Sequence, residues 1–211
     1  MTQYNIIAES QEYTVVAEYD HAATPAEGFQ SEADLEKEFI RLLGEQGYEY
    51  LPIHTEADLI SNLRTQLEKL NHYHFTDSEW EKFFNECIAN KNDDIVAKTA
   101  KIQDDYIQVL KRDTGESQNI KLIDKDNIHN NTLQVINQYV EEGGNYDTRY
   151  DVTVLVNGLP LVHIEMKRRG VQLKEAFNQI NRYQRDSFWA GCGLYEYVQI
   201  FVISNGTNTK Y

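Results

Sequence analysis

The sequence is poor in cysteine and has no long hydrophobic run. Two cysteines among 211 residues, Cys87 and Cys192, provide neither a disulfide framework nor a paired-cysteine metal knuckle. The first ten residues, MTQYNIIAES, lack the basic region and apolar core of a signal peptide. No apolar run approaches the roughly 20 residues that a membrane-spanning helix needs. These absences predict a cytoplasmic protein with no membrane partner.

Positive charge is also scarce, because 20 lysines and arginines stand against 34 acids and leave a net charge of −14. This balance argues against a protein that coats nucleic acid without selectivity. The bases are nevertheless concentrated in one stretch, which contains Lys167, Arg168, Arg169, Lys174, Arg182 and Arg185. Such a cluster can bind phosphates with a salt-dependent affinity, although a solvated helix face is the commoner role of a charge run.

The sequence also lacks the G-x-x-x-x-G-K-[ST] phosphate loop, so we do not expect it to bind ATP by that route. Its last residues, SNGTNTKY, include nothing that would cap a domain. We therefore expect the polypeptide to continue beyond Tyr211.

Residues 150–167 predict a β-hairpin. Apolar and polar residues alternate over 150–156, which is typical of a strand. Asn157-Gly158 follows as a turn, since both residues tolerate positive φ. Residues 159–167 form the returning strand, on which alternate side chains face opposite sides of the sheet.

Three charged residues lie on these apolar strands. Asp151 stands among valines, and Glu165 stands between Ile164 and Met166. Charged groups rarely occupy such positions unless they are paired or bind a metal. Two carboxylates on adjacent strands can hold Mg²⁺, and Lys167 would lie beside the ion to orient a water or stabilise a phosphoryl group. The pattern is typical of metal-assisted phosphodiester hydrolysis, although a surface hairpin with a solvated Glu–Lys edge would produce it too.

The metal site depends on the strand register. A two-residue loop alone pairs Asp151 with Ile164, so that Asp151 points away from Glu165. A three-residue loop or a β-bulge shifts the register and pairs Asp151 with Glu165. Pro160 cannot donate a ladder hydrogen bond and favours an irregularity. We therefore predict a bulged hairpin at Asn157–Pro160, and a plain two-residue turn would count against the metal site.

A helix is predicted after the hairpin from an apolar stripe made of Leu173, Ala176, Phe177, Ile180 and Tyr183. On this helix Gln179 and Tyr183 lie one turn apart. The helix could bring an amide and a hydroxyl to the site or to a DNA strand. Core packing of Tyr183 is an equally good interpretation.

Helices are expected before the hairpin. Ser31-Glu32-Ala33-Asp34 resembles a capping box, and the helix that follows should end at Gly44 or Gly47. Glu32 or Glu36 could reach a metal site, although acids commonly stabilise a helix N-terminus. A helical pair, over 55–70 and after Thr76, resembles an insertion before the sheet.

Strands dominate the second half. We expect strands at 106–110, 120–123 and 132–140, and a buried apolar strand at 198–203 beside the hairpin. Strands with a helix across one face predict an α/β fold.

These residues resemble a known family. Asp151 with Glu165-Met166-Lys167 resembles the PD-(D/E)xK nuclease core, and Gln179-Ile180-Asn181-Arg182-Tyr183 resembles the Q-x-x-x-Y motif of one branch. The wider sequence is similar to the N-terminal nuclease domain of type I restriction enzyme R (motor) subunits, over SEADLEKEFIRLLGEQGYEY, RYDVTVLVNGLPLVHIEMKRRG, EAFNQINRYQRDSF and YVQIFVISNGTNTKY. The proline that gives the motif its name is absent before Asp151.

The resemblance implies a PD-(D/E)xK mixed sheet with flanking helices. It implies that Asp151, Glu165 and Lys167 are catalytic, with Mg²⁺ held by the two acids. Gln179 and Tyr183 would assist by contacting or positioning DNA, with Arg168 and Arg182 as further candidates. Glu32 and Glu36 are candidates for the helix glutamate that some relatives use.

The resemblance also implies a domain organisation and partners. The endonuclease domain would span 1–211, with a core at about 31–50 and 105–205 and a helical insertion at about 55–100. Downstream motor domains would use ATP to translocate double-stranded DNA, in a complex with methylation and specificity subunits. Two alternatives are a non-cleaving DNA-binding or docking module, and a PD-(D/E)xK nuclease of another repair or restriction system.

Overall fold

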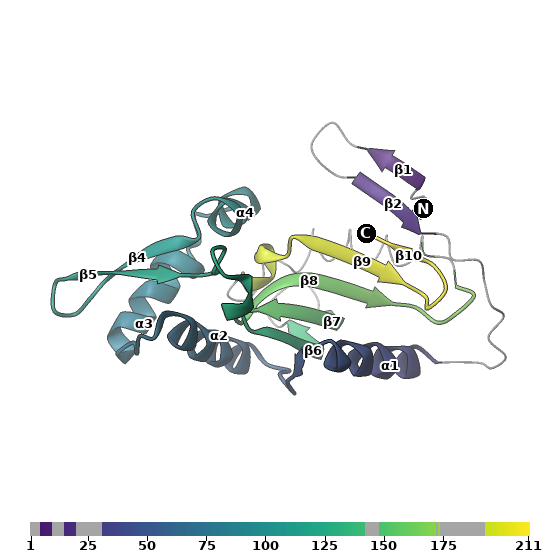
Figure 1. Cartoon of the computed structure of the whole chain (residues 1–211), viewed down its shortest axis with the longest axis horizontal. Coiled ribbons are helices and arrows are strands. Elements are labelled where there is room, and N and C mark those ends of the chain that lie inside the picture. The colour runs from purple at the N-terminus through teal and green to yellow at the C-terminus, as the bar shows by residue number, and fades with distance from the viewer. Residues whose placement is uncertain (1–4, 10–14, 20–30, 142–147, 172, 174–192) are drawn as a thin grey trace.

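A mixed eight-stranded sheet is the centre of the protein. The computed structural model describes residues 5–9, 15–19, 31–141, 148–171, 173 and 193–211 (Figure 1). The strand order is β1-β2-β10-β9-β8-β7-β6-β3, and only the β3–β6 and β8–β9 neighbours are parallel within these ranges. The strands are β1 (Asn5–Glu9), β2 (Val15–Tyr19), β3 (Glu49–Tyr50), β6 (Leu133–Glu141), β7 (Thr148–Val156), β8 (Leu159–Met166), β9 (Ile200–Ser204) and β10 (Thr209–Lys210). The expected α/β class is confirmed.

Helix α1 (Glu32–Glu45) covers one face of this sheet. Its start is fixed by the predicted capping box, in which the Ser31 hydroxyl accepts a hydrogen bond from the Asp34 N–H at 3.1 Å. The helix ends at Glu45, between the two predicted glycines. Its buried Leu35 and Leu43 form an apolar cluster with residues of the sheet, which are Val135, Val152, Val154, Ile164 and Met166.

The segment between β3 and β6 forms a lobe at one end of the sheet (Figure 1). It contains α2 (Glu56–Asn71), α3 (Asp77–Phe83), the π-helix η1 (Phe84–Ile88), α4 (Ile95–Gln103), β4 (Ile107–Lys111), β5 (Ser117–Lys121) and the 3₁₀ helix η2 (Ile128–Asn130). The expected helical pair is present, and α4 is an additional helix that the pattern did not predict. Strands β4 and β5 were predicted, but they form a separate two-stranded sheet.

The largest apolar cluster joins this lobe to the sheet. Leu59, Leu63 and Leu67 of α2 have no exposed surface, and they belong to the same cluster as Leu155 and Leu159. Those two leucines flank the turn between β7 and β8. The lobe therefore packs against the turn end of the hairpin.

Two predicted strands close the arrangement. The ambiguous segment 132–140 is a strand, β6, as expected. Strand β9 lies beside β8 as predicted, after the 3₁₀ helix η3 (Leu194–Tyr197). Full burial of this run was wrong, because Ile200 is 48% exposed. None of the described helices has the length and apolar character needed to cross a membrane.

Candidate active site

The turn between β7 and β8 contains two residues. Asn157 and Gly158 have φ of 51° and 83°, the left-handed pair that such a turn requires. Val156 pairs with Leu159 and Leu155 pairs with Pro160. The loop is therefore the two-residue turn, and it does not itself shift the register.

A bulge directly beyond the turn does shift the register. Val154 pairs with Val162, so Leu161 is an extra residue on β8. The pairing then continues to Val152 with Ile164, and in this register Asp151 lies opposite Glu165. The predicted bulged hairpin is confirmed, with its bulge one residue beyond the predicted range.

Buried amides hold the turn in place. Asn157 is 1% exposed, and its Nδ2 donates to the carbonyl of Leu122 at 3.0 Å and to Oδ1 of Asn131 at 2.7 Å. Its Oδ1 accepts from the N–H of Thr132 at 2.9 Å. Asn131 in turn donates from Nδ2 to the carbonyl of Asp124 at 2.8 Å. The turn is thus hydrogen-bonded to the loop that follows β5.

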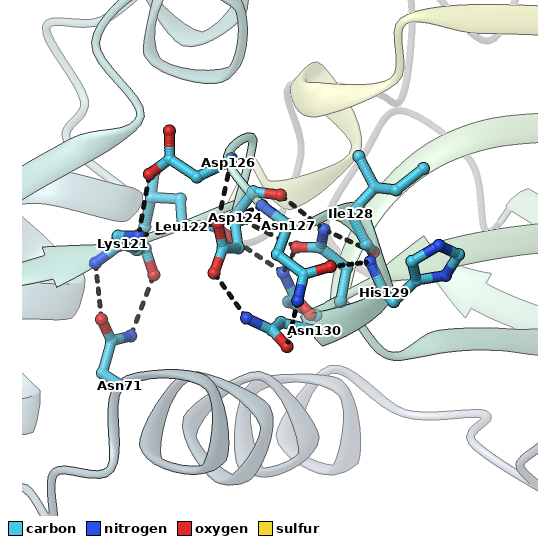
Figure 2. Close-up of polar contacts among 11 residues, drawn as sticks. Asn71, Lys121, Leu122, Asp124, Asp126, Asn127, Ile128, His129 and Asn130 are labelled. Atoms are coloured by element: carbon cyan, nitrogen blue, oxygen red, sulfur yellow. Dashed lines mark hydrogen bonds and ion pairs between the residues drawn. The ribbon is translucent and has the colours of Figure 1, made fainter.

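Figure 2 shows the neighbouring loop around Asp124. The Asp124 carboxylate accepts from the backbone N–H groups of Asp126 and Asn127 and from Nδ2 of Asn130. These hydrogen bonds, led by that of Asn130, lower the pKa of Asp124 to about 2. Asn71 of α2 exchanges two hydrogen bonds with the backbone of Lys121. The end of β5, from which this loop begins, is therefore joined to α2 by satisfied polar contacts.

Helix α2 also contacts the turn directly. A Cβ on Gly158 would lie 2.6 Å from Cα of Leu63, so only glycine fits against the helix backbone. The turn is enclosed between α2 and the loop, whereas most hairpin turns face solvent.

The open end of the hairpin carries the charged residues. Oδ2 of Asp151 accepts a hydrogen bond from the N–H of Met166 at 2.9 Å. Burial, followed by the charge of Glu165, raises the pKa of Asp151 to about 7. Glu165 is therefore close enough for its charge to oppose the ionisation of Asp151.

Lys167 partly compensates this charge. Its Nζ lies 2.6 Å from Oε1 of Glu165, whose side chain is fully buried. Burial acts to lower the pKa of Lys167, but the hydrogen bond and charge of Glu165 outweigh it, so the pKa is raised. Lys167 is therefore a cation in this arrangement.

The second oxygen of Glu165 is different. Oε2 is buried and makes no hydrogen bond within the described part of the chain. Nε2 of His163 lies 3.7 Å away, which is longer than a hydrogen bond. His163 was not predicted as a site residue, although its position two residues before Glu165 placed both on one face.

The two glutamates of α1 that were candidates for the metal site have separate roles. Glu36 is 8% exposed and accepts hydrogen bonds from the side-chain amides of Asn137 and Gln138. Its charge contributes to the raised pKa of Asp151. Glu32 is exposed and accepts from the N–H of Arg168 at 3.2 Å. Neither joins the two hairpin acids in a metal-binding group within the described residues.

The remaining predicted residues are only partly described. Arg168 follows β8 and is exposed. Gln179, Arg182 and Tyr183 lie outside the described residues. Leu173, the first member of the predicted apolar stripe, is buried against Ile203.

The donor set suits a hard divalent cation. Among the described residues no three His, Cys, Asp or Glu side chains form a metal cage. Mg²⁺ does not require one, since it commonly binds through one or two carboxylates, waters and substrate phosphates. The free Oε2 of Glu165 and the mutual repulsion of Asp151 and Glu165 both fit such a cation. Asp151 and Glu165 are the residues that would hold it.

Comparison with known proteins gives consistent matches. A family model described as "Type I restriction enzyme R protein N terminus" matches residues 29–211. The "Type I restriction enzyme EcoprrI endonuclease subunit" of Escherichia coli is 47% identical over 206 residues, which are 97% of this chain and 66% of the relative. The "Type I restriction enzyme SsaAORF53P endonuclease subunit" of Staphylococcus saprophyticus is 39% identical over 188 residues. The match covers 87% of this chain but 19% of that relative, so the chain spans only part of each relative.

Proposed function

Because the chain belongs to the family of type I restriction enzyme R protein N-terminal domains, we propose that it is the Mg²⁺-dependent DNA endonuclease domain of such a subunit. The observation that carries this proposal is the bulge at Leu161, which sets Asp151 opposite Glu165 with Lys167 beside them. The same arrangement supports a PD-(D/E)xK nuclease fold.

The described residues divide the work of phosphodiester hydrolysis. Asp151 and Glu165 hold the cation, which when bound supplies Lewis-acid stabilisation of a phosphate and an acidified water. Lys167 holds Oε1 of Glu165, so Oε2 would be available to the cation. The N–H of Met166 orients Asp151.

Lys167 acts as a positive charge beside the two acids. Its raised pKa keeps the ammonium protonated at neutral pH. A fixed cation beside the acids stabilises the negative charge that develops on the phosphate in the transition state.

The wider assembly belongs to the same proposal. The substrate is unmodified double-stranded DNA, brought to the site after ATP-driven translocation by motor domains and in complex with methylation and specificity subunits. Gln179, Tyr183, Arg182 and the exposed Arg168 are proposed to contact or position the DNA. The helical part of the lobe, at about 55–100, is proposed as the insertion in the nuclease core.

Substitution in the complete enzyme tests the proposal. Asp151→Ala, Glu165→Ala and Lys167→Ala should each abolish DNA cleavage while ATP hydrolysis continues. Lys111→Ala, on the exposed side of β4, is the control and should cut normally. Cleavage retained by any of the three would contradict the assigned roles. DNA binding that ignores both the divalent metal and these substitutions would favour a non-cleaving module.

A further inference from the structure

A fully buried histidine lies beside the proposed metal ligand. His163 is 0% exposed and shares one face of β8 with Glu165, two residues later. Its Nε2 lies 3.7 Å from Oε2 of Glu165. No role for this residue follows from the carboxylates and the lysine alone.

The histidine ring is itself tightly located. It packs edge-on against the ring of Tyr150, with the ring centroids 5.1 Å apart, and edge-on against the ring of Phe201, with the centroids 6.4 Å apart. Opposite it on β7, Thr153 contacts Tyr195 through their hydroxyl groups at 3.1 Å. An imidazole held in place by these contacts can orient the neighbouring carboxylate of Glu165.

Oε2 of Glu165 has to be oriented if it is to bind a cation. Lys167 holds Oε1, and no hydrogen bond within the described residues holds Oε2. A ring N–H on Nε2 attracts the anionic Oε2 electrostatically, but 3.7 Å is too long for a hydrogen bond that would compete with a metal. The oxygen is thus oriented and remains available.

Resting on the proposed function, we propose that His163 is a positioning residue that orients Oε2 of Glu165 for binding the divalent cation. Residues next to metal ligands commonly act in this way, and their loss weakens metal binding on the order of tenfold or more. The alternative is a purely structural role, in which His163 only fills the core between Tyr150 and Phe201.

The 211-residue chain and Mn²⁺ alone suffice for the test, by calorimetry on variants whose folding is verified by circular dichroism. His163→Leu keeps an apolar side chain of similar bulk but removes the ring N–H. We expect it to bind Mn²⁺ about tenfold more weakly. His163→Gln carries an amide N–H near the position of Nε2 and should bind within about threefold of wild type.

Two further variants separate position from packing. His163→Asn keeps a polar group but is too short to reach Glu165, so it should behave as His163→Leu. If the leucine variant fails to fold, the difference in Mn²⁺ affinity between the Gln and Asn variants still tests whether His163 positions Glu165. Thr153→Val disturbs the same part of the core without contacting Glu165, and it should bind Mn²⁺ as wild type does. Normal affinity in His163→Leu, or equally weak affinity in the Gln variant, would overturn the proposal.

A metal-free readout distinguishes this proposal from the proposed function. The ¹³Cδ resonance of Glu165, assigned by its loss in Glu165→Gln, should shift in His163→Leu and return in His163→Gln. An unchanged resonance in His163→Leu overturns the positioning role whatever the metal does. Absence of Mn²⁺ binding in the wild type, together with the expected resonance shifts, would contradict the metal site and leave the orientation of Glu165 by His163 supported.

Discussion

At the turn of the β7–β8 hairpin, buried polar atoms are matched by donors and acceptors, whereas at its open end charged groups crowd together. Two aspartates represent the contrast. Asp124, in the loop beside the turn, accepts several hydrogen bonds that lower its pKa to about 2. Burial and Glu165 raise the pKa of Asp151 to about 7 at the open end. Satisfied groups stabilise the fold, and unsatisfied ones mark the part of it that performs chemistry.

The largest effect on stability is expected at Gly158. Gly158→Ala would force a Cβ against the backbone of Leu63 and place alanine at positive φ. The free energy of unfolding in urea should fall by about 3 to 5 kcal/mol. Gly115→Ala is a matched control, because Gly115 also has positive φ in a hairpin turn but has open space around it. It should cost about 1 kcal/mol, and equal losses would show that α2 does not constrain the turn.

Asn157→Gly should destabilise the protein by about 2 kcal/mol. Glycine keeps the turn's φ but leaves the carbonyl of Leu122 and the N–H of Thr132 without their side-chain partner. Because the Leu161 bulge lies between the turn and the acids, the folded variant should bind Mn²⁺ with unchanged affinity. Weaker metal binding would mean that the turn also controls the site, and the contrast between the two ends would fail.

Asp151→Asn should stabilise the metal-free protein, the opposite of the two changes above. The folded pKa of about 7 exceeds the ordinary value of 3.8, so the native state loses stability as pH rises between those values. The amide avoids this loss and can still accept from Met166. We expect a gain on the order of 2 kcal/mol at pH 8 after allowing for partial solvent screening. The gain should vanish near pH 4, and a gain independent of pH would show that ionisation of Asp151 is not its cause.

Asp124→Asn should have the smallest effect, a loss of stability that is present at neutral pH and disappears in acid. The folded pKa of Asp124 lies below its ordinary value, so its contribution is complete above about pH 4 and is lost as pH falls towards 2. Thermal melts should show the wild type losing more stability than the variant between pH 5 and pH 2.5. If the two proteins lost the same stability between pH 5 and pH 2.5, ionisation of Asp124 would not stabilise the fold.

Local patterns predicted the elements that depend on neighbouring residues. The capping box at Ser31 located the start of α1, and alternation located β7 and β8. Pro160, together with the need to bring Asp151 beside Glu165, predicted a bulge. Its exact place at Leu161 was not predictable, since either side of the proline satisfies the same pattern.

Contacts between distant segments were not predictable. The pairing of β4 with β5 was expected, but their separation from the main sheet was not, because a local pattern does not identify the sheet that a hairpin joins. Helix α4 was missed because Ile95 and Val96 face outward and blur its apolar stripe. The amides of Asn137 and Gln138 reach Glu36 only once β6 packs beside α1.

The pairing of β2 with β10 has a consequence for the order of folding. Thr209 pairs with Tyr19, and Lys210 pairs with Glu18, so two segments far apart in the sequence meet in one sheet. Such pairing closes a very long loop and carries a correspondingly high entropic cost. During synthesis the β1–β2 hairpin has to wait for Thr209 and Lys210 to emerge before it joins the sheet through β10. We expect it to dock after the β6–β7–β8 strands have formed.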